Sequence, residues 1–352
     1  MLKVRKRDEC RWDLVALGEV MLRFDPGEDR IRTARNFRVW EGGGEYNVAR
    51  TLAHCFGARA SILTALADNH IGRLVADLIS QAAVDTSNII WREVDGISGN
   101  LRNGLNFVER GFGTRQPVGC SDRANTAISN LRTAEIDLSS IFDEQGSRWF
   151  HTGGIFAALS KDAPEVAIEA MRAARANGSI VSYDLNYRSS LWEGRGGLDA
   201  ANAVNRMLLN EADVVFGIEG FDSSLGGFTV AEFETAARSM MERHPSLKMV
   251  ATTLRDVISA SLHNISGALY FNGRTFLGNR FDNVQVLDRI GSGDAFAAGI
   301  AFGVLEDRDP QRSVDIAAAN AAYAVTCPGD ASTATLSDLE TMVNRNGAKI
   351  ER

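Results

Sequence analysis

Apolar runs alternate with helix-like segments along most of the chain, and this alternation constrains the fold more than any single motif does. The runs predicted as strands are 13–24, 60–67, 147–153, 179–186, 211–218, 247–254 and 257–263, and the segments predicted as helices are 45–57, 71–83, 160–178, 229–244, 295–305, 310–325 and 337–345. Strands that alternate with helices imply βαβ units, hence a mostly parallel sheet with helices on both faces. Ligands in such folds bind beyond the carboxyl ends of the strands. The pattern therefore predicts an α/β fold with its site at that edge of the sheet.

One stretch, residues 95–125, does not follow this alternation of strands and helices. It is rich in Gly, Asn and Arg, and polar and apolar residues alternate along it. A period of two predicts short antiparallel strands and not a helix. Such an insertion on a parallel sheet serves as a lid or as a dimer contact, or it is a plain surface hairpin, and composition does not decide between these.

Charge and composition narrow the classes of function. The formal net charge of −7 argues against a duplex-DNA binder, which needs a basic face. We expect a cytoplasmic protein without membrane contact, because there is no signal-peptide pattern and no run approaches the ~18 apolar residues of a membrane helix. The four cysteines and five histidines show no metal-ligand spacing. A small anionic ligand remains compatible with the sequence, because local arginines can bind it.

The stretch Gly291-Ser292-Gly293-Asp294 stands at the start of a helix-like run. Consecutive backbone N–H groups at a helix N-terminus attract anions, and glycines let a phosphate approach the backbone. Asp294 is negative and unsuited to hold a phosphate, but it could accept the proton of an attacking hydroxyl. An aspartate that only stabilises the first helical turn is the alternative. Neither a Walker sequence nor a Gly-x-Gly-x-x-Gly fingerprint occurs.

Two further clusters place glycines or polar side chains where a ligand could bind. In the stretch 41–49, three glycines precede a helix with Asn47 in its first turn, which permits close approach of a polar ligand. Further along, a strand ends in Asp184, Asn186 and Arg188, and the planar fork of Arg188 could hold a phosphate or a carboxylate. A flexible turn and a structural Arg–Asp pair are the respective alternatives.

The order of these motifs resembles the ribokinase-like (PfkB-type) carbohydrate kinase family. Gly-Gly-Gly-x-x-Asn comes early, Asp-x-Asn-x-Arg in the middle, and Asp-x-x-Gly-x-Gly-Asp-x-Phe late, at 288–296. The likeness runs over roughly residues 14–330. The stretches 42–57, 150–159, 182–192 and 326–330 are similar to the 2-keto-3-deoxygluconate kinase branch of that family in particular.

The resemblance implies a three-layer α/β/α ribokinase-like fold with a mostly parallel central sheet and a small β lid. One kinase domain would cover 12–345, with a lid formed mainly by 95–125 and part of 20–40, after an N-terminal extension at 1–11. The reaction would move the γ-phosphate of ATP to a sugar hydroxyl, with Mg²⁺ and with K⁺ as a candidate monovalent cation. The partners would be the sugar or sugar acid, ATP and further copies of the chain, with the lid as a candidate dimer contact.

The resemblance also implies roles for individual residues. By position Asp294 would be the base, and the N–H groups of 290–293, with Gly291, Ser292 and Gly293, would form the anion hole. The residues expected at the substrate are Gly43, Gly44, Asn47, Arg188 and Arg115, and those expected at the nucleotide are Asn186, Thr253, Arg255 and Asn320. Asp288 would lie at the monovalent cation and Glu219 at Mg²⁺.

The chain departs from the family pattern in two places that concern the metal and the nucleotide. Where the family has Asn-x-x-Glu near the metal, this sequence has Ile218 and Phe221, with Glu219 adjacent. Arg255 stands where the nucleotide segment of the family usually has a glycine.

A third departure concerns the lid. Deoxygluconate kinases carry a lid arginine that reads the sugar acid, and that position falls here on Cys120 or Ser121. Arg110, Arg115 and Arg123 are the candidates to replace it.

These observations favour an ATP-dependent kinase for a sugar acid, with 2-keto-3-deoxygluconate as the leading substrate. A kinase for a neutral ketose or pentose is the alternative within enzymes. A non-catalytic sugar-binding protein on the same fold, or a nucleotide-binding structural subunit, is the alternative outside them, and the intact Asp294 argues against both.

Overall fold

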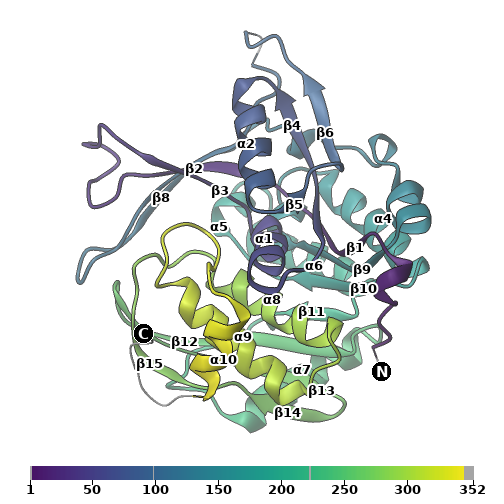
Figure 1. The fold of residues 1–352 in the computed structure, drawn as a ribbon, viewed down its shortest axis with the longest axis vertical. Helices are drawn as coiled ribbons and strands as arrows, with labels where there is room; N and C mark the ends of the chain where they lie inside the picture. Colours follow the sequence, from purple (N-terminus) through teal and green to yellow (C-terminus); the bar gives the residue numbers. More distant parts are fainter. Residues whose placement is uncertain (1, 98, 222, 345–352) are drawn as a thin grey trace.

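A mostly parallel β-sheet runs through the middle of the computed structural model, which describes residues 2–97, 99–221 and 223–344 (Figure 1). Its strands are β1 (Trp12–Leu17), β4 (Ala60–Asp68), β5 (Val84–Asp85), β6 (Ile89–Glu93), β9 (Ser147–Gly153), β10 (Ile180–Asp184), β11 (Val214–Phe216), β12 (Met249–Ser259), β13 (Leu262–Phe271), β14 (Arg274–Leu277) and β15 (Phe281–Gln285). They lie in the order β14-β13-β12-β11-β10-β9-β1-β4-β5, with β15 beside β13 and β6 beside β4. Neighbours are parallel from β12 to β5, whereas β13 pairs antiparallel with β12, β14 and β15.

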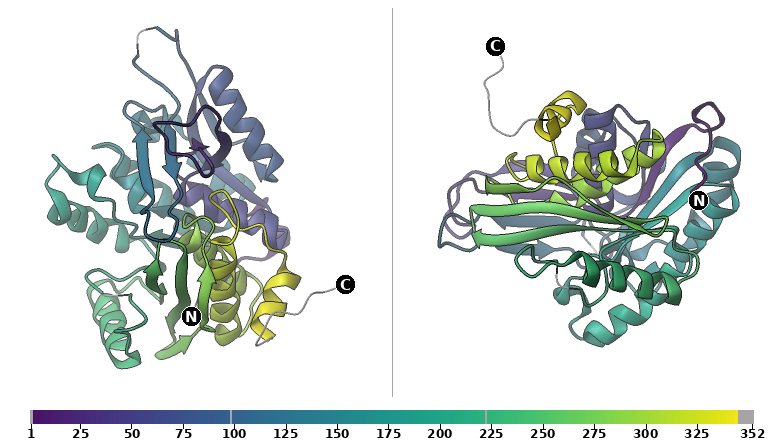
Figure 2. Two further views of the ribbon diagram at one scale, coloured as in Figure 1. Left: turned by 90° about the vertical axis from the view of Figure 1, so that its left-hand side faces the viewer. Right: turned by 90° about the horizontal axis from the view of Figure 1, so that it is seen from below.

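Helices cover both faces of this sheet, as Figure 2 shows in its right-hand view. On one face lie α1 (Gly44–Phe56), α2 (His70–Gln81), α8 (Ser292–Leu305), α9 (Pro310–Ala324) and α10 (Leu336–Asn344), and on the other lie α3 (Gly154–Ala157), α4 (Ala163–Ala176), α6 (Gly197–Leu209) and α7 (Val230–Arg243), with the short α5 (Ser189–Trp192) against α6. Successive strand residues enter opposite cores: Leu14 packs in one and Val15 in the other. The predicted three-layer α/β/α architecture is confirmed.

A second, four-stranded sheet projects from the body of the molecule (Figure 1). It consists of β2 (Met21–Asp25), β3 (Arg38–Gly42), β7 (Leu105–Glu109) and β8 (Val118–Asp122), in the order β3-β2-β7-β8. We call it the lid sheet. The antiparallel pair β7–β8 lies within 95–125, where short antiparallel strands were predicted.

The single strand predicted for 13–24 is wrong, because the chain divides it between two sheets. β1 ends at Leu17 in the central sheet, and β2 begins at Met21 in the lid sheet. The bend begins at Gly18, where a Cβ would clash with the buried side chain of Glu45. Both halves are apolar and largely buried, so the pattern of the sequence did not reveal the break.

Other boundaries also differ from the sequence predictions. The stretches 247–254 and 257–263 are not two separate strands, because β12 continues through a bulge to Ser259 and a tight turn then leads into β13. Helix α8 begins at Ser292 and not at 295. The last predicted helix begins at Leu336, and its final position, 345, lies outside the described residues. Helix α6 and the strands β14 and β15 were not predicted.

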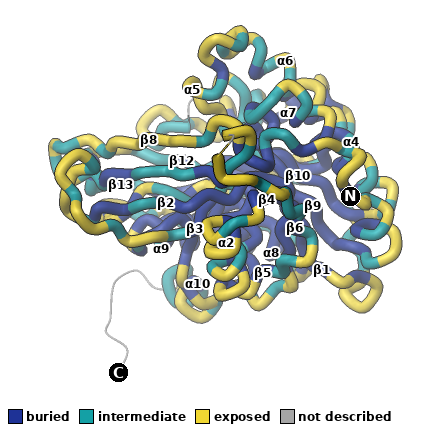
Figure 3. Tube along the Cα trace, turned by 90° about the horizontal axis from the view of Figure 1, so that it is seen from above, coloured by how far each residue is buried: buried dark blue, intermediate teal, exposed yellow. Residues whose placement is uncertain are grey.

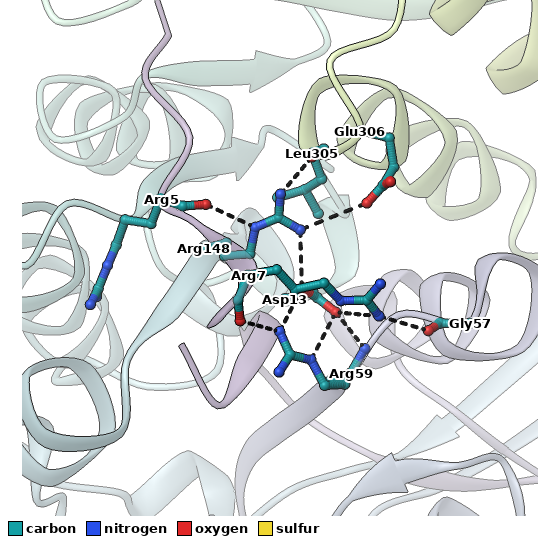
Figure 4. A network of polar contacts seen from close by, with 8 residues as sticks. All are labelled: Arg5, Arg7, Asp13, Gly57, Arg59, Arg148, Leu305 and Glu306. Carbon is teal, nitrogen blue, oxygen red and sulfur yellow. Dashed lines mark hydrogen bonds and ion pairs between the residues drawn. The ribbon is translucent and has the colours of Figure 1, made fainter. Parts of the chain in front are cut away.

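The segment before β1 is held to the body by a polar network around Asp13 (Figure 4). The Asp13 carboxylate accepts hydrogen bonds from Arg59 Nη2 at 3.1 Å and from Arg148 Nη1 at 3.0 Å. Arg148 Nε also donates to the carbonyl of Arg5 at 3.0 Å, and Arg7 Nη2 lies 3.4 Å from Asp13. The side chain of Arg7 and the backbone of Arg5 therefore attach this segment to the body of the molecule.

Helix α8 is apolar around almost its whole circumference and is buried between the central sheet, α1 and α9. Figure 3 shows the inner strands of the central sheet, such as β9 and β10, as buried and much of the surrounding loops as exposed. Phe296, 1% exposed, packs from α8 onto β13 at Gly267, where a Cβ would clash with the phenyl ring.

Within the described residues, no helix combines the length and hydropathy that crossing a membrane requires.

Phe296→Ala is expected to lower the free energy of unfolding by about 3–5 kcal/mol, because it leaves a cavity between α8 and β13. Urea denaturation followed by circular dichroism measures this loss. Ile258→Ala is the control, because Ile258 is exposed and its loss should change the stability by no more than about 0.5 kcal/mol. Equal effects of the two substitutions would contradict the packing described for α8.

Candidate active site

A cavity of about 590 Å³ lies between the lid sheet and the carboxyl ends of β10 and β12. This volume falls within the range of small-molecule sites. The floor is formed by the end of β10 and the residues after it, by Thr253 and Arg255 of β12, by the start of α1 and by the loop 286–291 that leads into α8. Residues of β7 and β8 form the opposite wall. The site thus lies where a parallel sheet places it.

The N-terminus of α8 forms one end of the cavity. Gly291 adopts a left-handed conformation, φ +79°, and a Cβ there would clash with the Asp330 carbonyl, so only glycine fits. Ser292 Oγ donates to the Ala321 carbonyl at 3.1 Å and anchors the turn. The first N–H groups of a helix have no intrahelical acceptor, and no side chain of the described residues caps them here. With the helix dipole, they form an anion-binding site.

Asp294 lies in the first turn of α8 and is held by α1. Asn47 Nδ2 donates to Asp294 Oδ2 at 2.7 Å, and Asn47 Oδ1 accepts from the Gly43 N–H at 3.3 Å. Gly44 leaves space beside the other oxygen, because a Cβ there would lie 3.9 Å from Asp294 Oδ1 and 3.5 Å from Asn186 Nδ2. The structure therefore brings the early, middle and late motifs together around one carboxylate.

Three buried or half-buried carboxyl groups, Asp294, Glu45 and Asp184, have a raised pKa at this point. Burial raises the pKa of Asp294 well above its ordinary value, and the neighbouring Asp184 and Glu45 raise it further. Burial raises the pKa of Glu45 to about 7 and that of Asp184 to about 6. Glu45 Oε1 accepts from the Phe156 N–H at 3.2 Å. A carboxylate in such surroundings has the basicity to take up a proton near neutral pH.

Arginines supply the positive charge of the cavity. Arg188, Arg255 and Arg289 all line it, and none of them forms an ion pair with another described residue. Burial lowers the pKa of Arg255, and the nearby positive charges of Arg289 and Arg188 lower it further. Cations that converge without an acidic partner favour a ligand with several negative charges.

The lid sheet contributes two arginines that are already paired. Arg123 donates to Glu19, and Arg110 donates to Asp25 and lies 3.8 Å from Asp288. Both line the cavity. Of the three candidates to replace the lid arginine, these two reach the site.

Three predicted site residues are not at the cavity. Arg115 donates from Nη1 to the Glu28 carbonyl at 3.3 Å and does not line it. Asn320, fully buried, donates to the Ala295 carbonyl at 2.9 Å and so joins α9 to α8. Glu219 pairs with Arg243 at 3.2 Å. The predictions for these positions came from the family resemblance, in two cases from residues near a position where the chain departs from it, and local packing directs the side chains elsewhere.

The remaining predicted residues line the cavity: Gly43, Gly44, Asn47, Asn186, Arg188, Thr253, Arg255, Asp288, Gly291, Ser292, Gly293 and Asp294. Sequence reasoning did not assign roles to Arg289 and Glu45. Arg289 stands inside the late motif, and Glu45 directly follows the glycine triplet. Both could therefore have been predicted at the site, because each is a charged residue within or beside a motif.

Asp288, predicted to face a monovalent cation, instead faces a guanidinium. Its Oδ2 accepts from Arg23 Nη2 at 2.6 Å. Among the described residues, no three His, Cys, Asp or Glu side chains are grouped closely enough to bind a metal ion.

An anion-binding helix terminus beside a buried carboxylate is the arrangement that phosphoryl transfer requires, since that reaction depends on positioning and on stabilisation of charge. The sequence model of the pfkB family of carbohydrate kinases matches residues 12–336, and the chain belongs to that family. It is therefore a carbohydrate kinase of an ATP-dependent family.

Relatives with known names agree with this assignment. The chain is 28% identical to a 2-dehydro-3-deoxygalactonokinase of Haloferax volcanii, over 97% of this chain and 99% of the relative. A solved 2-dehydro-3-deoxygluconokinase of Thermotoga maritima is 31% identical, covers 94% of this chain and 99% of its own, and superposes with a TM-score of 0.83. A probable fructokinase of Arabidopsis thaliana is also similar, 28% identical over 84% of this chain and 79% of the relative.

Glu45→Gln tests the burial of the carboxyl cluster. Because the pKa of Glu45 rises from 4.5 to about 7 on folding, the folded chain binds more protons between these pH values, so the wild type loses stability as the pH rises through that window. The glutamine of the variant does not titrate, so the variant does not lose this part of its free energy of unfolding as the pH rises. Its stability relative to the wild type should increase by on the order of 2–3 kcal/mol between pH 4 and pH 8. Urea denaturation at several pH values measures the difference, and parallel curves would contradict it.

Proposed function

We propose that this kinase transfers the γ-phosphoryl group of ATP to a hydroxyl of a 2-keto-3-deoxy sugar acid, with 2-keto-3-deoxygluconate as the leading substrate. The observation that carries the proposal is the convergence of unpaired arginines on a cavity that ends at Asp294 and the α8 N-terminus. With ATP bound in either case, a sugar acid brings one more negative charge to these arginines than a neutral sugar does. The names of the Haloferax and Thermotoga relatives support the same class.

In this proposal Asp294 is the base. The sugar hydroxyl oxygen attacks the γ-phosphorus, its proton passes to the Asp294 carboxylate, and ADP leaves with the bridging oxygen. Asn47 fixes the orientation of that carboxylate through the 2.7 Å hydrogen bond. The free N–H groups at the start of α8 stabilise the charge that develops on the transferred group.

Mg²⁺ would enter with ATP. This ion keeps several waters and is held by substrate phosphates and one or two carboxylates, so the site does not need a preformed acidic cage. Asp184, at the cavity wall, is the carboxylate suited to it. Bound Mg²⁺ would neutralise phosphate charge. A structure from Escherichia coli with the same fold, 18% identical and with a TM-score of 0.75, is a complex with ATP and Mg²⁺.

The alternative substrate is a neutral ketose or pentose, favoured by the likeness to the Arabidopsis fructokinase. Release of ADP with 2-keto-3-deoxygluconate, 2-keto-3-deoxygalactonate, fructose and ribose as acceptors separates the two. A higher kcat/KM for the acids supports the proposal, and a higher value for fructose or ribose contradicts it. The cytoplasmic location and a dimer through the lid sheet stay predictions.

Asp294→Asn is expected to lower kcat by about 10²–10⁴, because the amide cannot accept the hydroxyl proton. The fold should be retained, since the side chain keeps its size and its contact with Asn47. Asp282→Asn is the control, because Asp282 pairs with Arg280 at the surface. Unchanged turnover of Asp294→Asn with ATP would overturn the assignment of the base.

Arg255→Ala is expected to raise the KM for ATP by about 10-fold or more, because a charge-assisted contact to phosphate contributes about 1.5–3 kcal/mol. The control is Arg274→Ala, at an exposed position outside the cavity. If the KM for the sugar acid rises instead while that for ATP is unchanged, Arg255 belongs to the acceptor and not to the nucleotide.

A further inference from the structure

Arg23 is a lid-sheet residue whose charge is buried beneath the anion-binding loop. It lies on β2 and is 1% exposed. Its Nη2 donates to Asp288 Oδ2 at 2.6 Å, and its Nη1 donates to Asp330 Oδ1. A fully buried arginine requires such pairing, because an uncompensated charge in the interior is very costly. One guanidinium thus bridges two carboxylates from separate loops.

These two carboxylates flank the N-terminus of α8. Asp288 Oδ1 accepts from the Ile290 N–H at 3.4 Å, one residue before Gly291. The carbonyl of Asp330 lies so close to Gly291 that a Cβ would clash with it. We call residues 286–291, which lead into α8, the anion-binding loop. A positive charge placed between Asp288 and Asp330 therefore helps to hold this loop in position.

The resemblance to other kinases predicted a monovalent cation at Asp288, and the residues present do not fit one. Arg23 already supplies a positive charge to both carboxylates, and Arg110 brings a second guanidinium to 3.8 Å from Asp288. A further cation would face repulsion from both. A guanidinium also offers its donors in a fixed planar fork, which suits two carboxylates at once.

We propose that Arg23 takes the place of the monovalent cation: it is a positioning residue that holds the anion-binding loop, and it makes the kinase independent of K⁺. Arg23 belongs to the lid sheet and its partners to the loops around α8. The same contact therefore couples the lid to the phosphate end of the cavity.

The first test uses the wild-type enzyme and rests on the kinase activity proposed above. Turnover is measured at constant Mg²⁺ and ionic strength in KCl, NaCl and tetramethylammonium chloride. We expect rates that agree within about two-fold, because at equal ionic strength screening is equal and no cation site remains to be filled. Stimulation of several-fold by K⁺ over tetramethylammonium would overturn the proposal.

A melting experiment gives a readout that does not depend on activity. A cation that binds the folded chain raises the melting temperature by an amount that grows with its concentration relative to its Kd. The wild type should melt at the same temperature in all three salts, and a specific increase in KCl would contradict the proposal. If the enzyme shows no turnover with any acceptor, the proposed function is refuted. The melting temperatures in the three salts still test the role of Arg23 in that case.

Arg23→Ala adds a rescue experiment. This variant should lose at least about ten-fold in kcat, because two buried carboxylates lose their partner. Added guanidinium or K⁺ should restore part of the rate and raise the melting temperature, and tetramethylammonium should not. Arg102→Ala is the control, because Arg102 pairs with Asp122 at the surface of the lid sheet. A folded Arg23→Ala enzyme with an unchanged rate, or one that neither small cation rescues, would refute the role of Arg23.

Discussion

The positive end of helix α8 is the feature on which the rest of the site depends. This helix is buried along nearly its whole length, so its N-terminus has a fixed direction and faces the cavity. Gly291 allows the chain to turn against the Asp330 loop, and Ser292 ties the first turn to α9. A rigid support of this kind provides preorganised N–H groups at no cost during the reaction.

Charge is arranged around this terminus in two groups with different tasks. Burial raises the pKa of Asp294 where a hydroxyl would react, and the neighbouring Asp184 and Glu45 raise it further. Arginines line the cavity beyond them, where anionic groups of the ligands would lie. Asp294 is held by a hydrogen bond from the neutral Asn47 and forms no ion pair with a described arginine, although the charge of Arg188 lowers its pKa from a distance. A paired Asp294 would be a weaker base.

The sequence predicted the layers of the fold and most of the cavity, because both follow from local patterns. Strand–helix alternation defines the parallel sheet, and the motifs fall at the carboxyl ends of strands where ligands bind. Contacts across long separations could not be read in this way. Arg23 meets Asp288 across 265 positions. Asp288 stands in the late motif, but no local pattern marks Arg23 as its partner. Asn320 and Glu219 were expected at the site from the resemblance, Glu219 only because it lies next to a departing motif, but their side chains bond to Ala295 and Arg243.

The central claim is that one cavity places the acceptor hydroxyl at Asp294 and the γ-phosphate at the start of α8. A crystal structure with 2-keto-3-deoxygluconate and a non-hydrolysable ATP analogue tests it most directly. We expect an acceptor hydroxyl within about 2.6–3.2 Å of the Asp294 carboxylate and the terminal phosphate against the N–H groups of Ser292 and Gly293. A terminal phosphate bound away from α8, or an acceptor that does not reach Asp294, would contradict the account.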